Sequence, residues 1–229
     1  VDFSDPEVPK VHYTDKRGEA NLEGILSCEY VIDASGHSAF LANQLGTRQT
    51  VCSQLKFLSI WGYFKNSRYI GVDRAMHEPD QVQQHLPVTF VMSYSEGWIW
   101  HIILREHTSV GLIVHTDKTK GMDKQQRESF FKSTCANAPY LNKLLADAEF
   151  IEGSVQFRPD YSYYADRICG ENYYCIGDSA AFVDPIFSHG VQNAFYSAMI
   201  STLAITESIK TPQYRARFSQ LCESRLQQF

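Results

Sequence analysis

The feature that most constrains this chain is the run from residue 175 to residue 194. A short apolar stretch ends in Gly177-Asp178, Pro185 and Gly190 follow as turn signals, and a long helical pattern begins at Val191. This layout places a carboxylate at the end of a buried strand and directs a helix N-terminus at the same place. The first N–H groups of a helix lack intrahelical partners and lie at the positive end of its dipole. The run therefore favours an electron-rich or anionic ligand.

The composition indicates an ordinary globular protein. The 229 residues are 44% hydrophobic and 13% aromatic, with a formal net charge of −5 and no Lys/Arg-rich block. This charge pattern argues against nucleic acid as a main partner. No apolar run approaches the roughly 18–20 residues of a membrane span, and no signal-peptide pattern opens the chain, so we expect a cytoplasmic protein.

The cysteines and histidines give no sign of a disulfide framework or a metal site. Six cysteines occur without CxxC spacing, which is typical of buried free thiols in a reducing compartment. His101, His107 and His115 show no metal-ligand spacing. We therefore expect no bound metal.

Hydrophobic periodicity predicts a mixed succession of strands and helices. We expect a hairpin tip at 15–18 and a helix at 38–45 capped by Gly46. We expect the long helix to bury Val191, Ala194, Phe195 and Ala198. Strands are predicted at 30–32, 57–65, 87–93, 97–104, 109–115 and 173–176, an extended segment at 155–164, and the other helices at 124–134, 141–148, 191–210 and 214–229. The middle of the chain should form a mostly antiparallel sheet.

Each candidate motif also has an ordinary structural interpretation. An isolated Gly177-Asp178 is common turn material, and Asp33-Ala34-Ser35-Gly36 alone indicates only a strand end. Trp98 and Trp100 share one side of a strand, and composition alone favours two indoles in a core. The tyrosines of the segment 158–163 fit an edge strand with aromatic packing equally well. His189 is at least as easily an ordinary loop residue.

Taken together, these motifs resemble those of a known enzyme family. The run Asp-Pro-Ile-Phe-Ser-His-Gly-Val at 184–191 resembles the second cofactor motif of FAD-dependent monooxygenases with the hydroxybenzoate-hydroxylase fold, and within them the flavin-dependent halogenases. Asp33-Ala34-Ser35-Gly36 resembles a cofactor-adjacent segment of the same enzymes. Trp98-Ile99-Trp100-His101-Ile102 resembles the halogenase Trp-x-Trp-x-Ile-Pro motif, with Ile103 in place of Pro. Asp160-Tyr161-Ser162-Tyr163 resembles a segment of halogenases that act on phenols and pyrroles.

The resemblance implies an α/β fold of the mixed α+β kind. It is a portion of an FAD/NAD(P)-binding-type fold with an inserted, mostly antiparallel substrate-binding sheet. Residues 1–48 and 153–210 are expected in the FAD-binding domain, 49–152 in the substrate-facing sheet, and 211–229 at the start of a C-terminal helical region.

The resemblance also implies site residues. Trp98 and Trp100 form a steric gate that keeps organic substrate from the flavin, while His189 borders the halide through its backbone only. The implied cofactor-binding residues are Asp33, Gly36, Gly177, Asp178, Pro185, Gly190 and Val191. The implied halide-adjacent residues are Ser188, His189 and Gly190, and the implied substrate-lining residues are Tyr161 and Tyr163.

The implied activity is halogenation of an electron-rich aromatic ring, a phenol or pyrrole that is free or bound to a carrier protein. It uses O2, chloride or bromide, and FADH2 from a separate flavin reductase. Two alternatives stay open: an aromatic hydroxylase or prenyl-chain reductase of the same fold, as Ile103 allows, and a non-catalytic remnant that only binds a partner.

Two family elements are not found in the sequence. The Gly-x-Gly-x-x-Gly turn that holds the FAD pyrophosphate is absent. The halogenase lysine is expected upstream of Val1, so no catalytic residue is assigned. We therefore expect an internal portion of a longer flavoenzyme, one that binds FAD weakly by itself.

Overall fold

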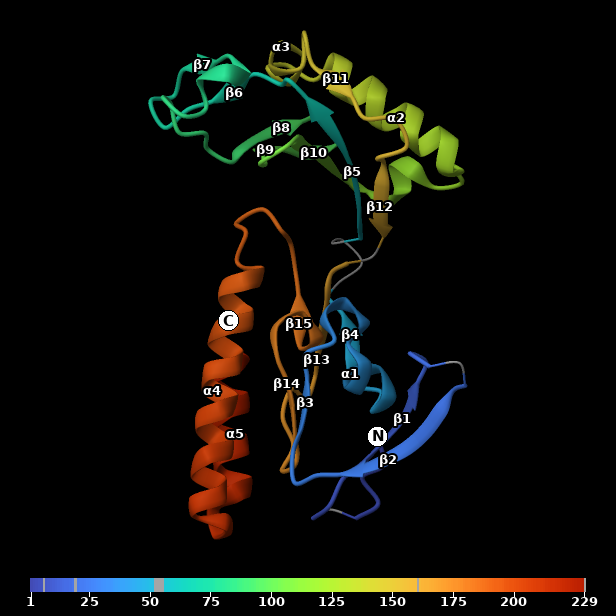
Figure 1. The fold of residues 1–229 in the computed structure, drawn as a ribbon, viewed down its shortest axis with the longest axis vertical. Helices are drawn as coiled ribbons and strands as arrows, with labels where there is room; N and C mark the ends of the chain where they lie inside the picture. The colour runs from blue at the N-terminus through green and yellow to red at the C-terminus, as the bar shows by residue number, and fades with distance from the viewer. Residues whose placement is uncertain (6, 19, 52–55, 160, 229) are drawn as a thin grey trace. The chain divides into compact units, whose positions relative to one another are not determined.

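The computed structural model describes residues 1–5, 7–18, 20–51, 56–159 and 161–228. Within it the chain forms two compact units, one built from residues 1–51 and 162–229 and the other from residues 52–161. The first is called the split unit here and the second the sheet unit (Figure 1). Each is described by itself.

An antiparallel sheet dominates the sheet unit, as the sequence predicts. Its strands are β5 (Phe57–Lys65), β8 (Phe90–Tyr94), β9 (Gly97–Ile103) and β10 (Thr108–His115), and they pair in the order β5-β10-β9-β8. Two short strands, β11 (Glu149–Phe150) and β12 (Gln156–Pro159), pair with the other edge of β5. β-branched and aromatic side chains supply most of these strands, which explains the clear signal.

One face of this sheet carries the core of the unit. Alternation along the strands turns Ile60, Ile99 and Leu112 to the same side, where they are fully buried. Helix α2 (Lys124–Asn137) packs on this face through Phe131, whose ring lies over Gly62. Asp123 caps α2 in a capping box with Gln126, and the short helix α3 (Leu141–Leu144) follows.

Smaller elements surround the sheet. A short hairpin, β6 (Tyr69–Ile70) with β7 (Met76–His77), follows β5 and leads into the 3-10 turn η3 (Pro79–Gln81). A second 3-10 turn, η4 (Thr116–Thr119), follows β10.

The split unit joins distant parts of the sequence. β3 (Val31–Asp33) pairs in parallel with β14 (Tyr173–Cys175). β13 (Tyr163–Ala165) lies between β4 (Arg48–Thr50) and β15 (Ala181–Phe182). A hairpin of β1 (Lys10–Asp15) and β2 (Leu22–Ser27) precedes them. Between β3 and β4 lie η1 (Gly36–Ser38) and α1 (Phe40–Gln44), and η5 (Gly177–Ser179) follows β14.

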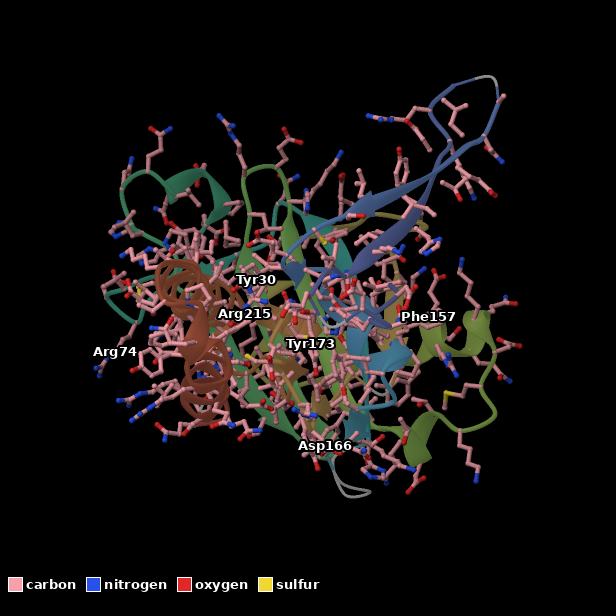
Figure 2. The ribbon with its side chains drawn as sticks, turned by 90° about the horizontal axis from the view of Figure 1, so that it is seen from below. Tyr30, Arg74, Phe157, Asp166, Tyr173 and Arg215 are labelled. Atoms are coloured by element: carbon pink, nitrogen blue, oxygen red, sulfur yellow. The ribbon has the colours of Figure 1, made fainter. Side chains whose placement is uncertain are left out.

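Two antiparallel helices complete the split unit. α4 (Gly190–Lys210) and α5 (Arg215–Leu226) lie side by side and are joined by η6 (Pro212–Tyr214) (Figure 1). The guanidinium of Arg215 lies 5.2 Å from the centre of the Tyr30 ring, which ties α5 to the segment before β3 (Figure 2).

The prediction for the inner face of α4 is wrong. Val191, Ala194 and Phe195 are exposed, and Ala198 is half-buried. Met199 and Leu203 continue the exposed apolar stripe of Val191 and Phe195. The buried face carries small residues instead: Ser197, Ser201, Ala204 and Ser208. Close packing against α5 favours small side chains. The buried hydroxyls of Ser197 and Ser208 donate hydrogen bonds to backbone carbonyls of the preceding helical turn. In α4 the periodic apolar residues therefore lie on the exposed side of the helix.

Other boundaries also differ from the predictions. The helix predicted at 141–148 ends at Leu144, and the strand predicted from residue 87 begins at Phe90. The units divide after residues 51 and 161, not 48 and 152, because β12 pairs with β5. The final helix belongs with the split unit, since α5 packs on α4. The flavin-binding and substrate-facing roles of the units stay predictions.

Five cysteines are free, and four of them are buried, as expected, while Cys52 lies outside the described residues. Among the described helices, none combines the length and hydropathy needed to cross a membrane.

His101 is a buried ionisable group on the core face of the sheet. It is 0% exposed, its Nε2 lies 2.8 Å from the Ser67 hydroxyl, and its Nδ1 has no hydrogen-bond partner in the described part of the chain. Ser67 in turn donates to the carbonyls of Arg68 and Leu144. Burial without a counter-charge lowers the pKa of His101 from 6.5 to about 4.

We predict that His101 makes folding pH-dependent. Between pH 6.5 and about 4, His101 is protonated in the unfolded chain but neutral in the folded chain. The free energy of unfolding is therefore fully retained above this window and falls as the pH falls through it, by on the order of 3 kcal/mol at 1.36 kcal/mol per pKa unit. Urea unfolding at several pH values gives the free energy of unfolding as a function of pH. The slope of this free energy against pH should be smaller for His101→Gln than for the wild type. Identical slopes would contradict a buried neutral histidine.

Candidate functional site

A left-handed turn at Gly177 brings the end of β14 against the start of α4. Gly177 has φ +56°, a conformation that residues with a Cβ rarely adopt. A Cβ at this position would lie 3.1 Å from the Cβ of Ala194. The Gly177 amide donates to the Ser197 hydroxyl at 2.8 Å. Close packing and one hydrogen bond thus fix the strand end to the first turns of the helix.

Asp178 follows this turn and faces the beginning of α4. Its Oδ1 lies 3.8 Å from the Cβ position built on Gly190, and its Oδ2 lies 3.5 Å from Nε2 of His37. The Tyr163 hydroxyl donates to the Asp178 backbone carbonyl, which holds this turn in place. The carboxylate is 29% exposed, so it is accessible without lying in bulk solvent. A carboxylate beside a helix N-terminus is stabilised by the helix dipole.

The loop before α4 leaves several amides available for a ligand. The Ile186 amide donates to the Asp184 carboxylate at 2.9 Å, and the Ser188 amide donates to the Pro185 carbonyl at 2.9 Å. Asn193 is the first residue of α4 whose amide finds a carbonyl, that of His189. Within the described residues, the amides of positions 190–192 donate to no backbone carbonyl.

The backbone at 188–189 has the form of an anion-binding nest. Ser188 is left-handed with φ +57°, and His189 follows in the right-handed region at φ −79° and ψ −7°. Successive residues of opposite hand turn neighbouring N–H groups toward one point. The three residues predicted to be halide-adjacent therefore lie together, although contact with a halide stays a prediction.

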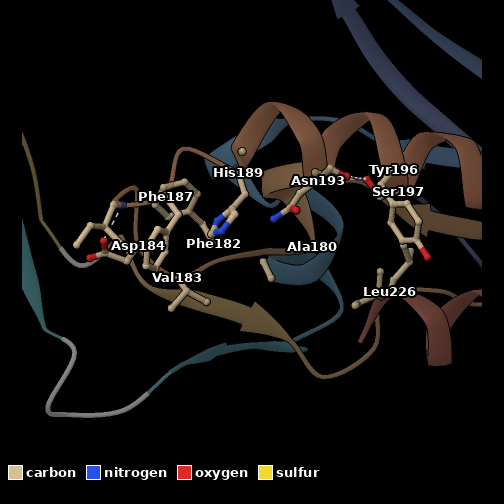
Figure 3. Close-up of a pocket in the computed structure, with 15 residues that line it drawn as sticks. Ala180, Phe182, Val183, Asp184, Phe187, His189, Asn193, Tyr196, Ser197 and Leu226 are labelled. Carbon is tan, nitrogen blue, oxygen red and sulfur yellow. Dashed lines mark hydrogen bonds between the residues drawn. The ribbon is translucent and has the colours of Figure 1, made fainter. Parts of the chain in front are cut away.

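A pocket of about 400 Å³ lies beside this loop (Figure 3). Its volume falls within the usual range of small-molecule sites. Asn193 and Tyr196 line it from α4 and Leu226 from α5, while Phe182 of β15 and the following Val183 also line it. Gly177 and Gly190 also border it, so two of the predicted cofactor residues share one cavity.

The other predicted cofactor segment is held by its own backbone. Asp33 is buried, and its carboxylate accepts hydrogen bonds from the amides of Ser35 at 2.8 Å and Leu41 at 2.7 Å. Gly36 has φ +63°, which the turn into η1 requires. Asp33 thus positions this turn and the start of α1, and its contact with a cofactor stays a prediction.

The tryptophan strand of the sheet unit presents both indoles on the face opposite α2. Ile99 and His101 enter the core, while Trp98 and Trp100 lie partly exposed on the other side, so the two indoles are not core residues. Their ring centres are 5.8 Å apart. Two bulky rings side by side form a continuous aromatic surface. The gating role of this surface stays a prediction.

Neighbouring strands fix and extend this surface. Trp100 Nε1 donates to the Ser109 hydroxyl at 3.1 Å, and the indole lies over Gly111, where a Cβ would stand 2.0 Å from its Cζ2 atom. Gly111 pairs with Trp100 on one side and Trp61 on the other. Alternation places Trp61 on the same face, so all three tryptophans of the chain share it.

The predicted substrate-lining tyrosines are both buried. Tyr163 is in the split unit, where its hydroxyl bonds to Asp178 and the Arg48 guanidinium lies 4.0 Å from its ring centre. Tyr161 is in the sheet unit, 4% exposed. Asp160 of the same motif lies outside the described residues. The substrate-lining role of these tyrosines stays a prediction.

Two site residues escaped the sequence interpretation. His37 reaches Asp178 from the turn after Gly36, and Asn193 lines the pocket from the first turn of α4. For His37, a polar residue directly after the Asp-Ala-Ser-Gly segment was the available signal. Asn193 lies three residues after Gly190 on a helix whose orientation the apolar pattern misrepresents.

Comparison with known proteins decides the family. A family model described as "Tryptophan halogenase" matches residues 5–229. The chain belongs to the tryptophan halogenase family. This membership confirms the resemblance to flavin-dependent halogenases that the motifs at 98–103 and 177–191 indicate.

Two curated relatives show how the halogenase family covers this chain. A tryptophan 2-halogenase of Chondromyces crocatus is 29% identical over 188 residues, and the flavin-dependent halogenase armH5 of Armillaria mellea is 31% identical over 199 residues. The alignments cover 81% and 85% of this chain but 34% and 37% of the relatives. The chain therefore spans about a third of the length of these halogenases.

Solved halogenase structures share the fold. The flavin-dependent halogenase CmlS matches with a TM-score of 0.83 at 26% identity, covering 99% of this chain and 38% of CmlS. The myxobacterial chondrochloren halogenase CndH matches with a TM-score of 0.80 at 25% identity, covering 95% of this chain and 47% of CndH. These matches confirm the mixed α/β class and the portion of an FAD-binding-type fold.

The Gly177 turn generates a first prediction for the site. Gly177→Ala should lower the free energy of unfolding by about 1–3 kcal/mol, because alanine is strained at φ +56° and its methyl crowds Ala194. Gly190→Ala is the matched control, since its Cβ meets only an ordinary contact at 3.8 Å. Urea unfolding followed by circular dichroism measures both. Equal stabilities would show that the turn does not fix α4.

The packing of the Trp100 indole against Ser109 and Gly111 generates a second prediction. In a chain with Trp61→Phe and Trp98→Phe, the remaining indole fluorescence reports Trp100 alone. Gly111→Ala should displace the ring, and Ser109→Ala should remove a hydrogen bond worth about 0.5–1.5 kcal/mol. Both changes should raise acrylamide quenching of this fluorescence.

Ser93→Ala is the matched control for Trp100, because Ser93 is exposed on the same face and pairs with Trp98. Quenching that is unchanged in both Ser109→Ala and Gly111→Ala would contradict the position of the Trp100 indole over Gly111 and Ser109.

Proposed function

We propose that this chain forms the flavin- and halide-facing part of an FAD-dependent halogenase that acts on an electron-rich aromatic ring. The observation that carries the proposal is the group of unpaired amides at the start of α4, beside both the Asp178 carboxylate and the 400 Å³ pocket. Family membership supports the reaction type, and the site geometry supports the ligands.

The residues present fit a flavin. The absence of a side chain at Gly190 lets a flat ring approach the backbone beside Asp178. The amides of residues 190 and 191 point from a helix N-terminus, where they stabilise negative charge on the pyrimidine edge of a reduced ring. When bound, reduced FAD would supply two electrons that reduce O2 to the peroxide level, and oxygen at that level can oxidise a halide. A separate flavin reductase provides it in that form.

Asp178 holds the polyol chain of the cofactor in this proposal. Its carboxylate accepts hydrogen bonds from ribityl hydroxyls, and such charge-assisted bonds are stronger than neutral ones. His37, 3.5 Å away, limits the directions in which the carboxylate can turn. The Tyr163 bond to the Asp178 carbonyl keeps the backbone of the turn fixed. The carboxylate is thereby pre-organised before the ligand arrives.

Chloride or bromide binds at the nest formed by Ser188, His189 and Gly190 in this proposal. The amides of His189 and Gly190 are the available donors, since the Ser188 amide donates to the Pro185 carbonyl, and the dipole of α4 adds positive potential there. The side chain of His189 is not required, since the backbone supplies the donors. A halide at this position lies at the same helix end as the flavin ring.

The aromatic face of the sheet unit separates the organic substrate from the flavin in this proposal. Trp98 and Trp100 supply bulk, and Ser109 and Gly111 hold the second ring in place. Such a barrier makes halide, not substrate, the first partner of the activated oxygen. A phenol or pyrrole, free or carrier-bound, is the substrate class we propose because its ring is electron-rich.

The test is the halide dependence of product mass. The protein is supplied with FAD, a flavin reductase, NADH, O2, and a panel of phenols and pyrroles, with chloride, bromide or no halide. Products that carry chlorine or bromine support a halogenase. Products that gain only oxygen indicate a hydroxylase of the same fold, and unchanged substrate together with no binding of added FAD indicates a non-catalytic remnant.

Asp178→Asn gives the matching binding prediction. The exchange should weaken FAD binding roughly 10- to 150-fold, since hydrogen bonds to a charged group contribute about 1.5–3 kcal/mol. Glu171→Gln is the control, because Glu171 is exposed in the same unit. Fluorescence titration of FAD measures the affinity, and circular dichroism verifies that each variant folds. Equal affinities would remove Asp178 from the site.

A further inference from the structure

Three potential metal ligands of the sheet unit lie together, apart from the site described above. Asp73 stands in the turn of the β6–β7 hairpin, His77 ends β7, and His85 lies in the segment that follows η3. The ligand atoms of the three side chains all fall within 4.8 Å of one another. His77 is buried, while Asp73 and His85 are accessible from solvent. The cluster therefore has a closed side and an open side.

The carboxylate of Asp73 is the centre of the cluster. Nε2 of His77 lies 2.9 Å from its Oδ1 and 3.0 Å from its Oδ2, and Nδ1 of His85 lies 3.5 Å from its Oδ2. Ligand atoms around a tetrahedral ion, bonded at about 2.0–2.2 Å, lie roughly 3.3–3.6 Å apart. The distances from the Asp73 carboxylate to the two histidines are close to this range, and the histidine nitrogens lie within 4.8 Å of each other.

We propose that Asp73, His77 and His85 form a binding site for a divalent transition-metal ion, with zinc as the natural probe. Two imidazoles and one carboxylate are a donor set suited to such ions. Three protein ligands leave a coordination position toward solvent for water. Hard ions such as magnesium prefer all-oxygen ligands and are poor occupants.

One ring must turn for the ion to bind. The imidazoles of His77 and His85 are stacked, with centres 3.9 Å apart and planes at 13°, so their in-plane lone pairs do not converge. His85 is the mobile partner, since its side chain is 40% exposed and that of His77 is 10% exposed. The Tyr69 hydroxyl donates to the His85 carbonyl at 2.8 Å, which anchors the backbone while the ring turns.

The surroundings of the cluster are compatible with a cation. Nε2 of His77 and the Ala75 amide both donate hydrogen bonds to the Asp73 carboxylate, which holds its oxygens in place. The neighbouring Arg74 is exposed and extends outward at the edge of the molecule (Figure 2). Gly71 packs directly behind the cluster: a Cβ there would lie 2.7 Å from Asp73 Oδ1 and 3.0 Å from His77 Nε2.

The sequence interpretation missed this site because the spacing follows no familiar pattern. Asp-x3-His-x7-His spans a hairpin and a 3-10 turn, whereas the usual zinc signatures place paired ligands on one helix or one tight loop. A bound ion ties the hairpin turn to the segment leading toward β8. The site rests on geometry independent of the flavin site, so either proposal stands if the other fails.

The test is calorimetric titration of the whole, chelator-treated chain with zinc, nickel and magnesium salts. We expect one zinc or nickel ion per chain, micromolar or tighter affinity, and no magnesium binding. His77→Asn and His85→Asn should each weaken zinc binding at least tenfold. His12→Asn, which removes an exposed histidine of the other unit, should leave it unchanged.

Gly71→Ala adds a variant that retains all three ligands. Its methyl enters the space beside Asp73 and His77, so zinc binding should again weaken at least tenfold, with folding verified by circular dichroism. Zinc binding of equal strength in the His77, His85 and Gly71 variants would overturn the proposal, as would the absence of stoichiometric binding to the folded wild type. Equal loss in His12→Asn would also overturn it by showing non-specific histidine binding.

Discussion

The attachment of α4 to the end of β14 is the constraint on which the site depends. Gly177 takes a left-handed conformation, contacts Ala194 and donates its amide to Ser197. A larger residue would push the helix away from the strand. Because the helix start is fixed there, its unpaired amides, the Asp178 carboxylate and the pocket occupy one small region. Gly177 allows the close packing of strand and helix. This packing brings together the groups that can bind a ligand.

This arrangement places the positive end of a helix dipole beside a negatively charged carboxylate. The N-terminus of α4 is positive, and Asp178 is a carboxylate a short distance from Gly190. A ligand that offers both hydroxyl donors and an anionic ring edge satisfies the two at once, whereas a simple anion satisfies only the helix. Both parts of a reduced flavin meet these demands. In the proposed function, the turn at Ser188 and His189 provides a separate place for a small anion at the same helix end.

The sequence predicted those features that depend on local periodicity and on short motifs. Alternation predicted the antiparallel sheet and the shared side of Trp98 and Trp100, although not that this side is outside the core, and Gly177-Asp178 predicted the turn after the strand. It failed where tertiary packing reverses the local signal: the buried face of α4 carries serines, and its apolar stripe is exposed. His37 and the histidine cluster at Asp73 were also missed, because loops and turns bring their residues together. Asn193 was missed because the apolar pattern misrepresents the orientation of its helix.

The most direct measurement is a nuclear magnetic resonance titration of the ¹⁵N-labelled chain with reduced FAD under anaerobic conditions. If the start of α4 receives the flavin, the amide resonances of residues 189–191 should shift with the largest amplitude and saturate together with that of Asp178. Shifts that leave these amides unchanged and gather elsewhere on the chain would contradict the central claim.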